Sequence, residues 1–312
     1  MKVLVAGGAG FIGSHLIDSL LDEGHTVVCV DNFFIGTDNN ILHLKTNRDF
    51  IFHNIDIDNL EDIKKVFEKE KIEFVFHLAA NSDIKASAEN PEIELRNTLL
   101  TTFNLLECMR LYGVKKMFFA STSAVYGEKN GVLLSENIVP LEPISYYGAA
   151  KLSSEALISA FSSMNDFSTL IFRFPNVIGG RLTHGVVYDF INKLKENPHE
   201  LKILGDGTQN KPYMHVSDLV KGIVNLKENL VKGIALYNIG VNSKTTVNRI
   251  ADIVCEGMKL KNVRYIYSGG KIGWKGDVAT FGYDLTKISN TGWKASMSSD
   301  EAVVAAVREM ML

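Results

Sequence analysis

The stretch KVLVAGGAGFIGSHL, residues 2–16, decides the fold of this chain. After Lys2 it begins with short apolar residues, two of them β-branched, which is typical of a buried strand. Glycines follow at Gly7, Gly10 and Gly13, and from Phe11 the apolar residues take helical spacing. Glycines at this point permit a tight turn and a close approach of the backbone to a ligand. The stretch therefore predicts a strand, a glycine turn and a helix whose N-terminus can bind a pyrophosphate.

Short apolar runs recur along the first half of the chain, and most of the stretches between them have helical spacing. The runs cover residues 2–7, 26–31, 49–54, 73–79, 116–121 and 168–174. Continuous apolar strands that alternate with helices indicate a parallel sheet covered on both faces. The predicted fold class is therefore α/β, a Rossmann-type doubly wound parallel sheet with a smaller C-terminal α/β lobe.

From about residue 175 this pattern loosens into helical stretches separated by glycine-rich loops and short strands. The helical stretches cover residues 186–196, 216–227, 246–258 and 300–311. We expect a first domain over residues 1–174, to which a segment of about 212–240 returns. Residues 175–312 are expected to form mainly the second lobe.

The composition is that of an ordinary globular protein, with 312 residues, 22% charged residues and a net charge of −3. The basic residues are scattered, so no nucleic-acid partner is expected. The apolar run before the first glycines is too short for a signal peptide or a membrane span, and a cytoplasmic protein without membrane contact is expected. The cysteines Cys29, Cys108 and Cys255 form no C-x-x-C pair, and no ligand spacing predicts a metal.

Asp31 ends the second apolar run, eighteen residues after Gly13. A carboxylate at this point is placed to accept hydrogen bonds from the adenosine ribose of a dinucleotide. It would also repel a 2′-phosphate, which favours NAD over NADP. The alternative is a purely structural turn, since many strand-to-helix turns contain glycine.

The run SYYGAAKLSSEA, residues 145–156, places Tyr147 and Lys151 four residues apart, on one face of a helix. A tyrosine with its ordinary pKa of about 10 is a poor base near neutrality. A nearby ammonium, together with the positive charge of a bound nicotinamide, favours the phenolate. Such a pair can take a proton from a sugar hydroxyl while hydride leaves the same carbon. Alone, the spacing also fits an ordinary pair on a helix surface.

These features occur in one order with HLAA (77–80), the hydroxyl cluster STS (121–123), FPNVIGGR (174–181) and GDGTQNKPYMHVSDLV (205–220). Together they resemble the extended short-chain dehydrogenase/reductase family, and within it the nucleotide-sugar 4-epimerases. The resemblance covers essentially the whole chain. It implies an NAD-binding Rossmann domain over 1–174 and a nucleotide-sugar-binding lobe over 175–312.

The resemblance also implies which residues bind the cofactor. Asp56 and Ile57 match a pair that contacts the adenine, and the backbone of Ala79 and Ala80 matches the segment that runs beside the pyrophosphate. The implied NAD-binding residues are Gly7, Gly10, Phe11, Ile12, Gly13, Asp31, Asn32, Asp56, Ile57, Leu78, Ala79, Ala80, Asn97, Tyr147 and Lys151.

In the family the catalytic hydroxyl lies four residues before the tyrosine of the VYG motif. That tyrosine is Tyr126 here, so the resemblance assigns the role to Thr122, beside Tyr147 and Lys151. The substrate-binding residues that it implies are Ser123, Asn176, Arg181, Lys211 and Trp274.

Two positions depart from the family pattern. Lys211 stands where many epimerases have an arginine that binds the diphosphate, and lysine lacks the planar bidentate fork. Trp274 stands where a second arginine is usual, and it either stacks on a ring or packs within the lobe. Arg181 and Lys275 are alternative cations for the diphosphate.

The hydroxyl cluster also separates the reactions of the family. Nucleotide-sugar 4,6-dehydratases carry Thr-Asp-Glu where this chain has Thr122, Ser123 and Ala124. The related UDP-glucuronate decarboxylases keep a glutamate at the position of Ala124. This chain lacks both acids, which makes a 4,6-dehydratase or a decarboxylase a weaker alternative.

The resemblance therefore implies an NAD-dependent nucleotide-sugar 4-epimerase, acting on UDP-glucose and UDP-galactose by transient oxidation at C4 and return of the hydride. The alternatives are a dehydrogenase or reductase that releases or consumes the 4-keto sugar, and an NAD-binding regulator without activity.

A homodimer is also implied, because helical patterns at 93–112 and 147–164 match the family's dimer-forming helices. An apolar stripe supports this expectation. Its members are Leu95, Leu99, Phe103, Leu106 and Met109. The alternative is that the stripe covers the sheet of its own chain.

Overall fold

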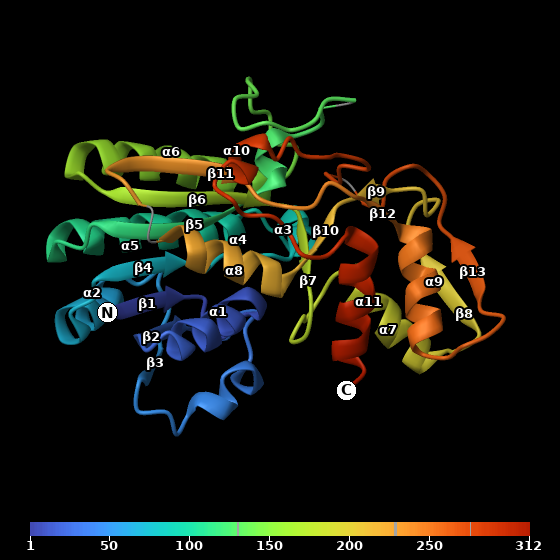
Figure 1. Ribbon diagram of the computed structural model, residues 1–312, viewed down its shortest axis with the longest axis horizontal. Helices are drawn as coiled ribbons and strands as arrows, with labels where there is room; N and C mark the ends of the chain where they lie inside the picture. Colours follow the sequence, from blue (N-terminus) through green and yellow to red (C-terminus); the bar gives the residue numbers. More distant parts are fainter. Residues whose placement is uncertain (130, 228–229, 275) are drawn as a thin grey trace. The chain divides into compact units, whose positions relative to one another are not determined.

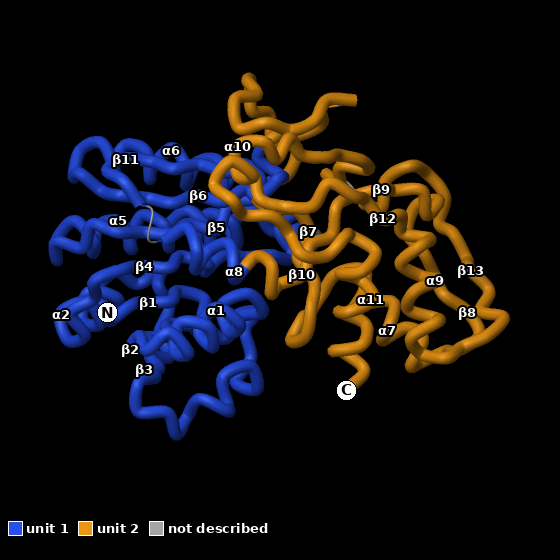
Figure 2. Tube along the Cα trace, viewed as in Figure 1, with its two compact units in different colours: residues 1–125, 146–173, 220–237 blue, residues 126–145, 174–219, 238–312 orange. Residues whose placement is uncertain are grey.

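The computed structural model describes residues 1–129, 131–227, 230–274 and 276–312. The chain forms two compact units, which are coloured separately in Figure 2. Unit 1 spans residues 1–125, 146–173 and 220–237, and unit 2 spans residues 126–145, 174–219 and 238–312. Unit 2 thus includes 126–145, which the sequence-based division had placed in the first domain. The binding roles of the two domains remain predictions.

Unit 1 alternates strands and helices. Its elements, including three that continue into unit 2, are β1 (Lys2–Ala6), α1 (Phe11–Asp22), β2 (Thr26–Asp31), β3 (Phe50–Asn54), α2 (Leu60–Glu70), β4 (Phe74–His77), α3 (Ile84–Glu89), α4 (Glu92–Glu94), a π-helix (Leu95–Leu100), α5 (Thr101–Tyr112), β5 (Lys116–Thr122), α6 (Tyr146–Asn165), β6 (Ser168–Phe174), α8 (Val216–Lys227) and β11 (Gly233–Asn238). Strands β1 to β6 agree within two residues at each end with the predicted apolar runs.

Within the described residues the strands form a seven-stranded sheet in the order β11-β6-β5-β4-β1-β2-β3, which Figure 1 shows from top to bottom. Strand β1 pairs in parallel with both β2 and β4. The order reverses at β1, as in a doubly wound sheet, so ligands are expected beyond the carboxyl ends of β1 and β4. The predicted fold class is confirmed.

Side chains of the central strands alternate between two covered faces. Val28 and Val30 belong to an apolar core with residues of α2, α5 and α6. Cys29, between them, points to the opposite face. A side chain at Gly8 would there meet Cys29 Sγ at 2.5 Å and Ile17 Cδ1 of α1 at 2.7 Å. Both faces of the sheet are therefore apolar, which explains the continuous apolar runs in the sequence.

Unit 2 contains short strands and three longer helices that pack on one another, α7, α9 and α11. Its further elements, with these helices, are β7 (Asn176–Ile178), α7 (Val186–Glu196), β8 (Glu200–Ile203), β9 (Asn210–Lys211), β10 (Tyr213–His215), β12 (Thr245–Thr246), α9 (Val247–Gly257), β13 (Arg264–Tyr267), α10 (Thr286–Ser289) and α11 (Ser299–Met310). The strands pair as β7 with β10, β9 with β12 and β8 with β13. No helix among the described residues has the length and apolar character needed to span a membrane.

The helical pattern predicted over 93–112 is present without a break. It is not α-helical throughout, because α4 continues directly into the π-helix Leu95–Leu100, which continues into α5. The apolar stripe expected on this segment is divided between two environments. Leu95 and Phe103 are exposed, whereas Leu106 and Met109 are buried in the core against the sheet.

Candidate active site

The glycine turn joins β1 to α1 and leaves no room for side chains. Gly7 has a φ of 79°, and a Cβ there would lie 2.7 Å from the backbone nitrogen of Ala79. A Cβ at Gly13 would lie 2.2 Å from the carbonyl oxygen of Gly7. The turn therefore lies directly against the HLAA segment that follows β4, so two of the predicted cofactor motifs are adjacent.

The N-terminus of α1 is suited to an anion. Gly10 is its N-cap and offers no side-chain acceptor, and the first turn carries no acidic residue. The first backbone N–H groups of a helix have no partner within the helix and, with the helix dipole, favour a negatively charged group. Phe11, Ile12 and Gly13 supply these groups. The dinucleotide pyrophosphate fits this combination of glycine cradle and uncapped helix.

Asp31 has a structural role that its position in the sequence did not indicate. Its carboxylate accepts hydrogen bonds from the backbone of Ala9 at 3.0 Å and of Phe33 at 2.8 Å. Burial raises the pKa of this carboxyl group, and the backbone hydrogen bonds act in the opposite sense. Asp31 thus links the glycine turn to the end of β2. The backbone of Asn32 is a third donor, which leaves about one of the four acceptor positions of the carboxylate for a ribose hydroxyl.

Two residues predicted to bind the adenosine are in contact with each other. Asn32 Nδ2 donates to Asp56 Oδ2 at 2.9 Å. Ile57 is buried, and its carbonyl accepts from Asn104. Asn97 is half-buried on the π-helix, whereas its neighbour Thr98 is fully buried. Leu78, Ala79 and Ala80 are half-buried beyond the end of β4.

The three consecutive hydroxyls at the end of β5 have different partners. Ser121 is buried and donates to Glu155 Oε1 at 2.5 Å, so it lies inside the unit. Thr122 is hydrogen-bonded to the side chain of Tyr147. Ser123 is half-buried in the 3₁₀ turn that follows. Among these hydroxyls, Thr122 is the one in contact with the candidate base.

Tyr147 and Lys151 lie in the first turns of α6. Tyr147 is half-buried, while Lys151 is 2% exposed and donates from Nζ to the carbonyl of Ala120 at 2.8 Å. Burial lowers the pKa of Lys151 to about 8, although Glu94 and Glu155 oppose this change. The lysine is therefore mainly charged at neutral pH and loses its proton near pH 8.

The pKa of Tyr147 is raised rather than lowered. Burial is the main cause, the negative charge of Glu94 adds to it, and the hydrogen bond with Thr122 acts in the opposite sense. The sequence had led us to expect that Lys151 would dominate and favour the phenolate. The positive nicotinamide ring of bound NAD would favour the phenolate, so the residues present fit a base that depends on its cofactor.

Sequence reasoning missed a buried ion pair beneath this site. Arg173 of β6 binds Glu155 of α6 with two hydrogen bonds, at 2.9 Å and 2.5 Å. Both side chains are buried, and Ser121 donates to the same carboxylate. The signals were a lone arginine within the apolar run STLIFRF and a glutamate one helical turn after Lys151.

The predicted substrate residues lie in unit 2, except for Ser123. Lys211 forms a buried ion pair with Asp277, and its ammonium lies 5.3 Å from the centre of the Trp274 ring. Trp274 itself is 41% exposed. The structure thus brings Lys211 and Trp274 together and adds Asp277, which sequence reasoning had not assigned. The positive charge of Lys211 is already compensated by this carboxylate.

The other two predicted substrate residues of unit 2 that the structure describes lie in β7 and just after it. Asn176 is exposed in β7, where it is paired in register with Tyr213 of β10. Arg181 follows β7 with a φ of 64° and is half-buried. Lys275, an alternative cation for the diphosphate, lies outside the described residues.

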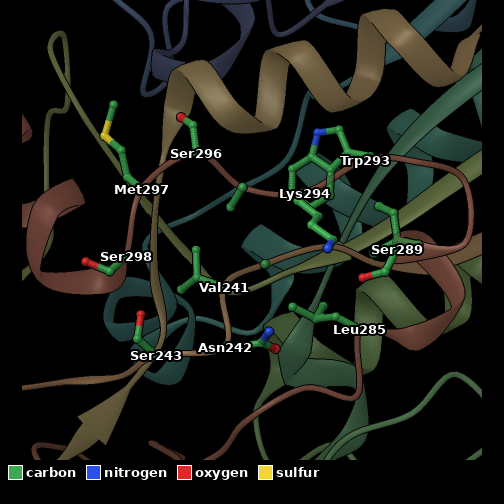
Figure 3. Close-up of a pocket in the computed structure, with 13 residues that line it drawn as sticks. Val241, Asn242, Ser243, Leu285, Ser289, Trp293, Lys294, Ser296, Met297 and Ser298 are labelled. Atoms are coloured by element: carbon green, nitrogen blue, oxygen red, sulfur yellow. The ribbon is translucent and has the colours of Figure 1, made fainter.

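Unit 2 also contains a pocket of about 360 Å³, shown in Figure 3. Its apolar part includes Leu285, Ile288 and Trp293, and polar side chains such as Lys294 and Ser298 lie around it. None of the residues predicted to bind cofactor or substrate, or to act in catalysis, lines this pocket.

The fold and the site together define a dinucleotide-binding α/β enzyme with a tyrosine–lysine pair at the carboxyl edge of its sheet. The chain belongs to the NAD dependent epimerase/dehydratase family, because the sequence model of that family matches residues 3–240. The predicted family is therefore confirmed.

Similar proteins narrow the class of reaction. The putative UDP-glucose 4-epimerase of Methanocaldococcus jannaschii is 34% identical over 316 residues, covering 99% of this chain and 98% of that protein. The crystal structure of UDP-glucose 4-epimerase from Thermotoga maritima with UDP-glucose has a TM-score of 0.89 at 32% identity, covering 99% of this chain and 98% of that one. UDP-glucuronic acid 4-epimerase from Bacillus cereus, in complex with UDP-glucuronic acid and NAD, also has a TM-score of 0.89, at 30% identity and the same coverage. These similarities confirm the predicted enzyme class, an NAD-dependent nucleotide-sugar epimerase, and NAD as its cofactor.

Proposed function

We propose that this protein is a UDP-sugar 4-epimerase that interconverts UDP-glucose and UDP-galactose. The observation that carries the proposal is the contact of Tyr147 with Thr122, one helical turn from the buried ammonium of Lys151. Ser123 and Ala124 follow Thr122, so the chain has no acidic pair there for the removal of water. The similarity to proteins named UDP-glucose 4-epimerase supports glucose and galactose as the sugars.

In the proposed reaction Tyr147 takes the proton from the 4-hydroxyl of the sugar. Thr122 hydrogen-bonds the same hydroxyl and directs it toward the phenolate, while Lys151 supplies positive charge close by. Bound NAD would supply a reversible hydride acceptor for C4. After the sugar has presented its other face, Tyr147 gives its proton to the C4 oxygen, which becomes the new hydroxyl. Asn176 is proposed to bind the diphosphate end of the substrate, and Trp274, whose ring faces the ammonium of Lys211, to stack on one of the substrate's rings.

The experiment that tests this function follows sugar identity and NADH absorbance together. UDP-glucose, UDP-galactose, their N-acetyl forms, UDP-glucuronate and a GDP-sugar are incubated separately with the protein and NAD. We expect interconversion of UDP-glucose and UDP-galactose without accumulation of NADH, because the hydride returns to the same carbon. Accumulation of NADH would instead identify a net dehydrogenase, and faster turnover of another sugar would correct the substrate.

We also propose that the protein is a homodimer, formed through α5 and α6. Phe103 of α5 is exposed and lies edge to face with Phe161 of α6, at 6.1 Å between ring centres. Met164, three residues after Phe161 on α6, is also exposed. Multi-angle light scattering at micromolar concentration is expected to give twice the mass of the 34.6 kDa chain. A mass equal to one chain would contradict the proposal.

A further inference from the structure

Glu94 has a buried side chain on α4, which packs against α6, and no sequence motif singles it out. It is the last residue of α4 and is 2% exposed. The π-helix that follows carries Thr98, which donates to Glu94 Oε2 at 2.7 Å. Asn81, from the loop after β4, donates to Glu94 Oε1 at 2.8 Å. Both donors are neutral.

Neighbouring hydrogen bonds help to identify the donor and the acceptor in the contacts of Thr98 and Asn81 with Glu94. Thr98 Oγ1 accepts from the backbone of Asn81 and donates its own proton to Glu94 Oε2. The backbone of Asp83 donates to Asn81 Oδ1, so the amide nitrogen of Asn81 faces Glu94. Each oxygen of Glu94 thus accepts a hydrogen bond from a neutral side chain, and neither of these donors supplies a positive charge.

The buried charges around the site balance only when Glu94 is included. Arg173 and Glu155 form a bidentate pair and neutralise each other. Lys151 is buried and its ammonium donates to a backbone carbonyl, which carries no formal charge. Glu94 lies on α4, which packs against α6, the helix that carries Tyr147 and Lys151, and its negative charge acts on both of these side chains. A buried charge without a counter-charge is costly, so the two belong together energetically.

We propose that Glu94 is a positioning residue of the candidate active site, whose carboxylate balances the buried ammonium of Lys151 and keeps it charged beside Tyr147. The inference rests on the proposed function, in which Lys151 acts as a cation. The other charged or titratable groups that face Lys151 are Glu155 of α6, paired with Arg173 of β6, and His77 of β4. Burial and the charge of Lys151 hold the pKa of His77 well below its usual range, so His77 adds no charge.

Lys151 can be titrated directly in the protein without NAD or substrate. Protein labelled with ¹³C-lysine is followed by NMR from pH 6 to 10, and the Lys151 signal is assigned with the Lys151→Met variant. In the unaltered protein we expect a midpoint of about 8. In Glu94→Gln, which keeps the shape and removes the charge, the midpoint should fall by about one pH unit. The alkaline limit of turnover should move in the same direction.

Two variants serve as controls. Glu92 is exposed on the same short helix, so Glu92→Gln removes an equal charge and should leave the midpoint unchanged. Glu94→Asp keeps the charge but shortens the side chain by one methylene. The Lys151 midpoint in this variant should lie between those of the unaltered protein and of Glu94→Gln. If Glu94→Gln does not fold by circular dichroism, the smaller fall in Glu94→Asp still tests the inference.

An unchanged midpoint in a folded Glu94→Gln or Glu94→Asp protein overturns the inference, even if the sugars are interconverted. Lower turnover at every pH without movement of the midpoint also overturns it, because a merely structural role would give that result. A fall in the midpoint without any interconversion of sugars supports the charge balance and refutes the proposed function instead. The two failures are therefore distinguishable.

Discussion

Replacing Tyr147 with phenylalanine is expected to lower kcat for the interconversion of UDP-glucose and UDP-galactose by about a hundredfold to ten-thousandfold. The substitution removes the oxygen that accepts the proton from the 4-hydroxyl, while the ring still fills its half-buried place in α6. The glycine turn and Asp31 are unchanged, so NAD binding should be retained. Turnover is measured by sugar identity, and NAD binding by calorimetry.

Tyr146 provides a matched control for this substitution. It is the preceding residue of the same helix and is 54% exposed. Tyr146→Phe is therefore expected to leave turnover close to that of the unaltered protein. Thr122→Val should have an effect between the two, because it removes a hydrogen bond to the reacting hydroxyl but no proton acceptor. Turnover in Tyr147→Phe near that of the unaltered protein would refute the mechanism for any substrate.

The fold was predictable because its strands are buried on both faces. Alternation of apolar runs with helical spacing then identifies a doubly wound sheet, and β1 to β6 lie where these runs predicted them. The glycine turn was predictable for a related reason, since Gly7 and Gly13 each lie where a side chain would collide with backbone. The contact of Gly13 with Gly7 and the positive φ of Gly7 are local requirements that a glycine-rich sequence displays, whereas the close approach of Gly7 to Ala79 is seen only in the structure.

Much of the site depends on partners that are distant in sequence. Lys211 and Asp277 are 66 residues apart, and spacing alone could not pair them. The π-helix was equally hidden, because a single added residue per turn leaves no clear periodicity in a short segment. It lies between α4 and α5 within one continuous helical segment, and Thr98 in it donates to Glu94 four residues earlier. The opposite directions of Ser121 and Thr122, by contrast, follow from strand alternation.

The largest effect on stability is expected from Arg173→Met. The substitution leaves the carboxylate of Glu155 buried without its cation, with Ser121 as the donor to one oxygen. Removing one partner of a buried ion pair typically costs about 3–5 kcal/mol of unfolding free energy. Because Ser121 precedes Thr122 and Glu155 lies one turn after Lys151, the loss should also disturb the candidate site. Urea unfolding followed by circular dichroism measures the change in unfolding free energy.

Two further variants distinguish the effect of breaking the buried ion pair from the effect of losing an arginine side chain. Arg110 makes a similar two-bonded contact with Glu107 at the surface, so Arg110→Met should change the unfolding free energy little, because water stabilises the charge left behind. The double variant Arg173→Met with Glu155→Gln removes both buried charges and keeps an acceptor for Ser121. It should be more stable than Arg173→Met alone, since no buried charge is then unpaired. A double variant as unstable as the sum of the two single substitutions would show that the two side chains act independently.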